Sequence, residues 1–357
     1  MSFFLVCAIA FFLVVLLMHP LRRIALFAGV VDKPGGRKSH TKAVPPVGGL
    51  IIFSVFMILG VFSGIVDLDK YWALYVGLVI LLVSGALDDQ LSLPAVLKLV
   101  LQLVAAVIVA FGGDVQAAYL GDLFGFGVVW TGFLSYPFTL IAVVLLINSM
   151  NLIDGIDGLA GGISIVFFAL FVVAAIQGGW DGTAQVLGLL IACVLGFLMF
   201  NMRSPWRRRA HVFLGDAGST ALGLVIAWFA VHLARGPMAP LEPIVVAWII
   251  GFPIFDTCAQ FYRRVCAGRD PFAPDRGHFH HHLVDAGIPV HYASVLIICI
   301  ALIMGGGAYG AYLLGVPNII LTFGWIILLF VHIAMSCRPE RYVRFLRRIF
   351  APFVRKA

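Results

Sequence analysis

The sequence predicts an all-α, polytopic membrane protein, and three observations carry this prediction. Of its 357 residues, 62% are hydrophobic and 11% are charged, whereas a soluble globular protein carries roughly 25% charged residues. Apolar runs of about 20 residues, the length that crosses a bilayer as a helix, recur from one end of the chain to the other. The basic residues also gather in alternate connecting segments, as the loops of a membrane protein do. The lipid bilayer is therefore the first expected partner.

We expect eleven membrane spans, at residues 2–19, 46–64, 72–87, 95–111, 134–151, 159–176, 184–201, 217–233, 241–261, 292–313 and 317–336. The first segment has no basic stretch before it and no A-x-A cleavage site after it, so it is predicted to be a retained span and not a signal peptide. No long linker or internal repeat interrupts the chain. The sequence therefore predicts one integral-membrane domain over 1–357, with a basic tail at 337–357.

The basic residues also predict the orientation. If the segment after the first span is cytoplasmic, 22 of the 24 lysines and arginines lie on the cytoplasmic side, and only Lys70 and Arg235 lie outside. Cytoplasmic loops of membrane proteins carry such an excess of basic residues. The sequence therefore predicts eleven spans, with the N-terminus outside and the C-terminus in the cytoplasm.

Charge and cysteine content exclude two other classes of partner. The net charge is +7, but its distribution follows membrane topology, so no nucleic acid is expected. The six cysteines form no C-x-x-C pair, and five lie within or beside apolar runs. Cysteines in such places act as small apolar residues, so neither a disulfide nor a cysteine metal site is predicted.

The first polar motif is Leu87-Asp88-Asp89, at the cytoplasmic end of the third predicted span. Two adjacent carboxylates repel each other, so near a membrane they need a cation, a proton or basic neighbours. Lys98 and Gln102 form another polar pair across a short loop. The alternative readings are a solvated helix end for the acids and a topology anchor for the lysine.

The second motif, at 148–162, places a polar side chain at every third position: Asn148, Asn151, Asp154 and Asp157. Nine residues make two and a half helical turns, so Asn148 and Asp157 point in opposite directions on a continuous helix. The four side chains can converge only if the helix breaks, and Gly155 and Gly158 favour a break. Amide and carboxylate oxygens suit Mg²⁺. The alternative is a simple Asn/Asp/Gly turn.

The third motif is FLGDAGST at 213–220. It places Asp216 at a predicted helix N-terminus, where free backbone N–H groups can bind phosphate. Asp216 can ligate a metal that also binds phosphate. It can equally serve as a helix cap.

The fourth motif, at 270–282, contains four histidines and Arg276. Zinc is disfavoured because no cysteine is near and adjacent histidines point in divergent directions. Phosphate or sugar binding is the better hypothesis. Upstream, a basic loop at 32–40 either enforces topology or meets an anionic lipid head group.

Together these motifs resemble the polyprenyl-phosphate N-acetylhexosamine-1-phosphate transferase superfamily, glycosyltransferase family 4. The resemblance covers roughly residues 20–300 and rests on VDKPGGRKSH (31–40), PPVGG (45–49), LDD (87–89), NSMNLIDGIDGLAGG (148–162), FLGDAGS (213–219) and DRGHFHHH (275–282). The DRxHxHH form is similar to the WecA-like branch. That branch usually takes UDP-GlcNAc as donor and undecaprenyl phosphate as acceptor.

The motifs and the resemblance give three groups of candidate site residues. The metal ligands, for Mg²⁺ with Mn²⁺ as a substitute, are Asn151 and Asp216. The catalytic carboxylates are Asp88, Asp89, Asp154 and Asp157. The substrate contacts are Lys98, Asn148, Arg276, His278, His280, His281 and His282, with Lys33, Arg37, Lys38 and His40 in the basic loop.

The resemblance further assigns a role to each group. Asp88 is the base for the lipid phosphate, and Lys98 contacts the donor pyrophosphate. Asp154 and Asp157 lie around the nucleotide. Arg276 and the histidines select the sugar.

The expected reaction is transfer of GlcNAc 1-phosphate from UDP-GlcNAc to undecaprenyl phosphate, which yields undecaprenyl-diphospho-GlcNAc and UMP. The resemblance implies that this occurs at the cytoplasmic face of a bacterial inner membrane, as the first membrane step of a cell-surface polysaccharide pathway. UDP-MurNAc-pentapeptide or a modified UDP-N-acetylhexosamine stays open as donor, and so do the polymer supplied and the oligomeric state, a homodimer included. A transporter is disfavoured because its ionisable residues lie near the bilayer midplane, not at helix ends on one side.

Overall fold

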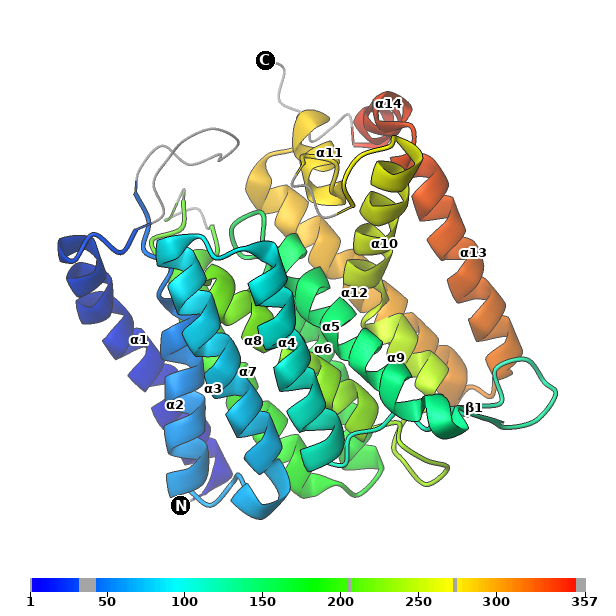
Figure 1. Cartoon of the computed structure of the whole chain (residues 1–357), viewed down its shortest axis with the longest axis horizontal. Helices are drawn as coiled ribbons and strands as arrows, with labels where there is room; N and C mark the ends of the chain where they lie inside the picture. The colour runs from blue at the N-terminus through cyan, green and yellow to red at the C-terminus, as the bar shows by residue number, and fades with distance from the viewer. Residues whose placement is uncertain (1, 32–42, 204–206, 208, 272–274, 351–357) are drawn as a thin grey trace.

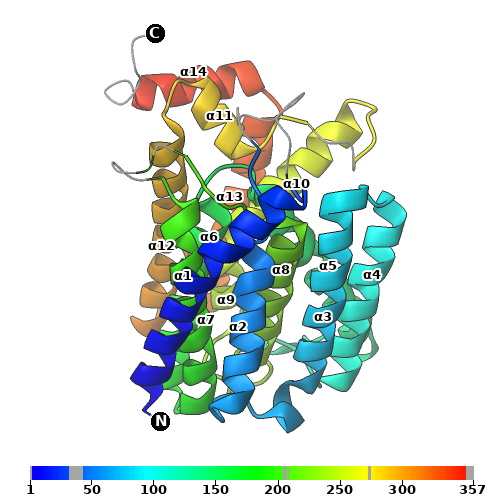
Figure 2. The same ribbon diagram turned by 90° about the vertical axis from the view of Figure 1, so that its left-hand side faces the viewer.

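The computed structural model describes residues 2–31, 43–203, 207, 209–271 and 275–350. The described chain is almost wholly helical (Figure 1), which confirms the predicted fold class. Its one strand pair within these ranges is a short antiparallel hairpin of β1 (Tyr119–Gly121) and β2 (Val129–Trp130). The helices stand side by side as a bundle, with shorter helices lying across one end (Figures 1 and 2).

Eight helical segments of the described residues are long and apolar enough to cross a bilayer. They are α1 (Phe3–Phe27), α3 (Leu68–Leu91), α4 (Ala95–Val107) with the π-turn η1 (Ile108–Gly112), the 3-10 turn η2 (Gly132–Leu134) with α5 (Ser135–Ile153), α6 (Leu159–Gln177), α7 (Asp181–Asn201), α12 (Val290–Leu313) and α13 (Asn318–Ser336). The pair α9 (Pro243–Ile249) and α10 (Gly251–Cys266), which bends by 73°, makes a ninth if it is one broken span and not a re-entrant loop. The chain is therefore a multi-pass membrane protein.

The two remaining predicted spans also fall on helices but do not meet the same criteria. α2 (Gly48–Phe62) has only 15 residues. α8 (Gly215–His232) begins with polar residues and is nearly all buried within the bundle, where it packs against α2, α3 and α5. The count of eleven spans therefore stays a prediction.

Small residues let α8 approach its neighbours closely. A Cβ atom on Gly49 would stand 2.1 Å from the Cα of Gly218, and one on Gly85 would stand 2.3 Å from the Cα of Ala217. Such small-residue contacts are the usual way that membrane helices bring their backbones together. They fix α2 and α3 directly against the first turns of α8, beside Asp216.

Two short helices complete the end of the bundle where the C-terminus lies. α11 (Phe279–Asp285) and α14 (Pro339–Ile349) pack against each other there. Figure 1 shows the N-terminus at the opposite end. The polar ends of α3, α5 and α8 point to the same end as α11, so the predicted motifs do gather on one side of the molecule.

Candidate active site

The turn between α3 and α4 pairs Asp88 with Lys98. α3 stops at Ser92, which adopts a left-handed conformation with φ 53°, and α4 begins three residues later. Asp88 accepts a hydrogen bond from the Leu93 N–H at 2.7 Å through Oδ1 and one from Lys98 Nζ at 2.8 Å through Oδ2. Both oxygens of this buried carboxylate are therefore engaged, and the lysine is the group that it positions.

Lys98 in turn faces Asp216 in the first turn of α8, with 4.0 Å between Nζ and Oδ2. Asp216 accepts a hydrogen bond from Asn151 Nδ2 at 3.0 Å, and the same amide donates to Ser219 Oγ at 2.9 Å. Asp216 does not cap α8, since it lies inside the helix and its own N–H donates to Asp89 Oδ1 at 3.1 Å. Asp89 from α3 thus takes one of the free N–H groups at this helix start.

The predicted helix break lies where the glycines favoured it, because α5 ends at Ile153 and α6 begins at Leu159. Gly158 has φ 80°, which only glycine adopts readily. The four polar side chains of the motif nevertheless do not all converge. Asn148 exchanges hydrogen bonds with Gln102, Asn151 meets Asp216, and Asp157 accepts from Arg203 Nε at 2.6 Å and from a backbone N–H at 3.0 Å.

Asp154 lies at the break, outside the helices. Burial, together with the negative charges of Asp216, Asp157 and Asp89, raises its pKa well above the usual range. Like charges this close disfavour simultaneous ionisation. The cluster therefore favours an added positive charge, whether a proton or a metal cation.

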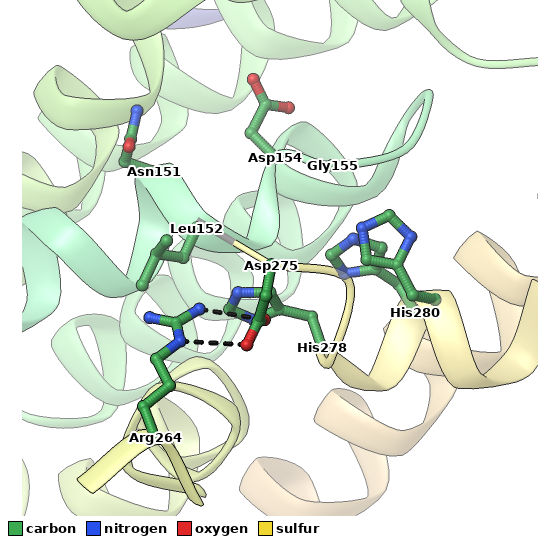
Figure 3. A pocket seen from close by; sticks show the side chains of 9 residues that line it. Asn151, Leu152, Asp154, Gly155, Arg264, Asp275, His278 and His280 are labelled. Atoms are coloured by element: carbon green, nitrogen blue, oxygen red, sulfur yellow. Dashed lines mark hydrogen bonds and ion pairs between the residues drawn. The ribbon is translucent and has the colours of Figure 1, made fainter. Parts of the chain in front are cut away.

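Beside this cluster is a pocket with a cavity volume of about 220 Å³, between the α5–α6 break, α10 and α11. Its lining residues are Asn151, Leu152, Asp154, Gly155, Arg264, Asp275, His278, His280 and His281. Figure 3 shows Arg264 reaching the carboxylate of Asp275, with Asn151 and Asp154 on the other side of the pocket. The second and fourth sequence motifs thus form opposite walls of one site.

The histidines of the fourth motif divide between two faces of α11. His280 and His281 line the pocket, and His280 has no hydrogen-bond partner among the described residues. Burial lowers the pKa of His280 well below its usual range, and burial with the nearby Arg276 lowers that of His281 to about 4. Both rings are therefore neutral at pH 7. Neutral imidazoles donate and accept hydrogen bonds, which suits sugar hydroxyl and amide groups better than phosphate.

Of the other members of the motif, His282 and Arg276 face away from the pocket and His278 lines it. The His282 ring lies 5.4 Å from that of Tyr342 in α14 and does not line the pocket. Arg276 is an exposed partner of Asp285 at 3.4 Å. His278 lines the pocket and also has its Nδ1 2.8 Å from Asp256 Oδ2. The basic-loop predictions, Lys33, Arg37, Lys38 and His40, lie outside the described residues.

Sequence reasoning missed three charged residues that build the site. Arg264, only 4% exposed, holds Asp275 through two hydrogen bonds of 3.1 and 3.2 Å. Burial by itself raises the pKa of the Asp275 carboxyl. Hydrogen bonds from Arg264 and a backbone N–H outweigh this effect and lower the pKa to about 2. Asp256 is buried within α10 and also accepts from the Phe279 N–H at 2.9 Å. A carboxylate inside an apolar segment was the available signal for Asp256.

The donor set fits Mg²⁺, although no three His, Cys, Asp or Glu side chains of the described residues gather as a metal-binding group. Neighbouring oxygens around octahedral Mg²⁺, at 2.0–2.1 Å from the ion, are about 2.9 Å apart. The Asn151 amide and the Asp216 carboxylate are 3.0 Å apart, and turning the amide over presents its oxygen there. Mg²⁺ usually takes one or two protein ligands and completes its shell with water and substrate phosphates.

The close contact of α3 with α8 gives a first prediction. Gly85→Ala should destabilise the protein by about 1–3 kcal/mol, the usual cost of overpacking, because the new Cβ meets the Ala217 backbone. It should also lower activity, since Asp89 and Asp216 lie next to this contact. Thermal unfolding in detergent and turnover measure the two effects. Gly307→Ala in α12 is the matched control, because a Cβ there meets nothing within 4 Å. Equal melting temperatures for the two variants would contradict the assignment.

A multi-pass helical bundle with a lysine, carboxylates and a polar pocket at one end has the features of a membrane-embedded enzyme. The family model for glycosyl transferase family 4 matches residues 71–234. The undecaprenyl-phosphate alpha-N-acetylglucosaminyl 1-phosphate transferases of Escherichia coli K12 and Yersinia pestis are each 33% identical, over 92% of this chain and 89% of theirs. A probable undecaprenyl-phosphate N-acetylglucosaminyl 1-phosphate transferase of Bacillus subtilis is 37% identical, over 80% of this chain and 78% of its own.

The chain therefore belongs to glycosyl transferase family 4 and is a transferase enzyme. The resemblance seen in the sequence motifs is confirmed. The match at 71–234 includes Asp88, Lys98, Asn151 and Asp216, whereas the histidine motif lies beyond it and is covered by the longer alignments.

Proposed function

We propose that this enzyme transfers GlcNAc 1-phosphate from UDP-GlcNAc to undecaprenyl phosphate and releases UMP. The observation that carries the proposal is the chain of contacts Asp88–Lys98–Asp216–Asn151, which lies at one end of the bundle and borders the pocket. A water-soluble donor and a lipid acceptor can meet only near a membrane surface. The names of the relatives specify the same acceptor and the same sugar.

In the proposed reaction, an oxygen of the lipid phosphate forms a bond to the β-phosphorus of the donor, and the bond from that phosphorus to the UMP oxygen breaks. The two substrates are both anions, so the protein must offset their repulsion. Lys98 does this directly, and it lies 4.0 Å from Asp216. Asn151 and Asp216 would hold Mg²⁺, which supplies further positive charge to the phosphates. Phosphoryl transfer depends mainly on such positioning and charge stabilisation.

In this proposal Asp88 acts through Lys98. A phosphate monoester has its second pKa near 6 and is already mostly dianionic at pH 7, so the acceptor has little need of a base. Both oxygens of Asp88 are engaged, one with Lys98 Nζ and one with the Leu93 N–H. Asp89 holds the first turn of α8 through the Asp216 N–H. Asp157 holds Arg203 and Ala210 against the helix break.

The pocket is assigned to the donor. Asn151 belongs both to the Asp216 cluster and to the pocket wall, so a pyrophosphate held at the cluster leads directly into the pocket. His280 and His281 are neutral at pH 7 and offer hydrogen bonds to the N-acetylhexosamine. Asp154, at the break, faces the same space.

The function is tested with purified protein in detergent, undecaprenyl phosphate and a panel of radiolabelled UDP-sugars. UDP-GlcNAc should give a lipid-linked radioactive product and UMP in equal amounts. UDP-GalNAc and UDP-MurNAc-pentapeptide distinguish the rival donors, and Asp216→Asn protein is the inactive control. Preference for another donor would correct the sugar, and absence of a lipid product from every donor would refute the reaction.

We further propose eleven spans in the bacterial inner membrane, with the N-terminus outside and the site at the cytoplasmic face. The start of α1 and the helix α14 lie at opposite ends of the bundle (Figure 1), as an odd number of spans requires. The basic residues in the last turns of α10 and α14 share the end that carries the site. The concentration of basic residues at that end supports a cytoplasmic assignment.

Cysteine labelling tests this orientation. In a variant without the six native cysteines, Met238→Cys should react with a membrane-impermeant maleimide in intact cells. Met238 is 94% exposed and belongs to the segment between α8 and α9, which lies at the end opposite the site (Figure 1). Arg269→Cys, exposed at the site end, should react only after the cells are permeabilised. Reversed labelling would place the site on the outer face and remove access to cytoplasmic UDP-sugars.

A further inference from the structure

The C-terminal helix α14 carries an apolar stripe that the protein leaves partly uncovered. Tyr342 and Leu346 are buried against α11 and α13. Phe345 and Ile349, one helical turn apart, are 49% and 52% exposed. Residues four apart lie on one face of a helix. The apolar side of α14 is therefore wider than the surface that the bundle covers.

The position of α14 shows where this stripe lies. α14 begins three residues after the end of α13, whose exposed apolar residues form a stripe along its outer side, at Ile320, Phe323, Ile327, Phe330 and Val331. Such a stripe on a membrane helix faces lipid. Figure 2 shows α14 lying across the end of the bundle, whereas the long helices run along it. α14 thus leaves the membrane end of α13 parallel to the membrane surface.

The charged residues of α14 are mostly basic. Residues 338–348 contain five arginines and one glutamate. Arg341 and Arg348 stand four residues before and three residues after Phe345, so both lie beside the exposed apolar stripe, along the edge away from the buried Tyr342 and Leu346. Neither has a carboxylate partner within the described part of the chain. Arg347 donates to the Asp285 carbonyl at 3.2 Å, and Arg344 donates to that of Glu340 at 3.4 Å.

We propose that α14 docks on an anionic phospholipid surface, with Phe345 and Ile349 in the acyl–headgroup boundary and Arg341 and Arg348 on lipid phosphates. An apolar stripe flanked by basic residues on an in-plane helix is the arrangement that binds such surfaces. The charge complementarity favours anionic lipid over a second copy of this chain, whose matching face carries the same positive charge.

Docking of α14 also supports the wall of the pocket. The Tyr342 ring packs on Phe279 at 5.7 Å and on His282 at 5.4 Å, both in α11. The opposite face of α11 presents His280 and His281 to the pocket. α11 has only seven residues, and helices this short are marginal without tertiary contacts. Anionic lipid bound at α14 therefore stabilises α11.

Hydrogen exchange of the full chain in nanodiscs tests the proposal, and because it needs no substrate its failure leaves the proposed reaction untouched. Amides of 339–349 and 279–285 should exchange more slowly in phosphatidylcholine–phosphatidylglycerol discs than in phosphatidylcholine discs. Arg341→Gln should speed exchange in the anionic discs about fivefold, the contribution of one basic residue at such a surface. Arg269→Gln removes the same charge from an exposed position after α10, outside α14, and should change little. The double variant Phe345→Ser/Ile349→Ser should lose the slower amide exchange in anionic discs. Thermal unfolding checks that this variant is still folded.

Each other outcome contradicts a defined part of the proposal. Equal protection in both kinds of disc would exclude an anionic-lipid site. Equal effects of Arg341→Gln and Arg269→Gln would exclude α14 as the site of lipid contact. Protection in detergent that rises with protein concentration would identify a second copy of the chain as the occupant. Protection of 339–349 without any change in 279–285 would refute the coupling to α11.

Discussion

Asp216→Asn and Asn151→Ala should each lower kcat by at least roughly 10²–10³, the cost of removing one group that stabilises developing charge. Asp216→Asn keeps the shape of the side chain and its contact with Asn151 but removes the negative charge that holds a cation. Asn151→Ala removes the partner that stands 3.0 Å away. Turnover measured against Mg²⁺ concentration should also show weaker metal binding in both variants, as a higher half-saturating Mg²⁺ concentration, and exhaustive EDTA treatment should abolish wild-type activity.

Asp69→Asn is the matched control, since it removes one carboxylate charge at an exposed position at the opposite end of the bundle. Its turnover and Mg²⁺ dependence should equal those of the wild type. Thermal unfolding separates a damaged site from a damaged fold. Wild-type activity that survives EDTA, or an Asp216→Asn protein with an unchanged Mg²⁺ titration, would rule out the metal assignment.

The helical elements could be predicted from sequence because a bilayer leaves a chain few choices. In lipid every backbone N–H and C=O must be satisfied within the segment, so a long apolar run forms a helix. The bend within the span predicted at 241–261 was harder to predict from the sequence. It falls at Ile250, three residues before Pro253, whose missing N–H weakens the helix there. The polar start of α8 is tolerated because neighbouring helices cover it, a tertiary effect that hydropathy does not report.

The candidate site was predictable at the level of which residues share one end of the molecule. Its pairings were not. Asn148 with Gln102 and Asp157 with Arg203 are each 46 residues apart in sequence, and only the packing of helices decides such contacts. Spacing also suggested that the four polar residues of the second motif act together. They separate because Asn148, Asn151 and Asp157 each find a partner on a different element.

Arg264 illustrates the same limit. In the sequence it reads as a basic anchor at the end of a span, and the positive-inside rule accounts for it fully. In the structure it is buried and holds Asp275 in the pocket wall. A basic residue can follow the positive-inside rule and also form part of the site. The sequence pattern indicates only the topological role.

Asp88→Asn should lower kcat by roughly 10²–10⁴, whether Asp88 is a base or the group that positions Lys98. The two roles differ in how the loss combines with Lys98→Ala. If Asp88 acts through Lys98, removing it from a protein that already lacks the lysine should cost little, because residues that act as a unit are strongly non-additive. If Asp88 is an independent base, the two losses should multiply.

The structure favours non-additivity. Lys98 Nζ is held 2.8 Å from Asp88 Oδ2 and is 4.0 Å from Asp216 Oδ2, so without Asp88 the ammonium group can move toward Asp216 and oppose the cation proposed there. Calorimetry of UDP-GlcNAc binding gives a second readout, since a misplaced Lys98 should weaken donor binding in Asp88→Asn as much as in Lys98→Ala. A base would leave donor binding intact and remove the acidic limb of the pH–rate profile. Multiplicative losses with unchanged donor affinity would therefore exclude the positioning role and return Asp88 to direct chemistry on the lipid phosphate.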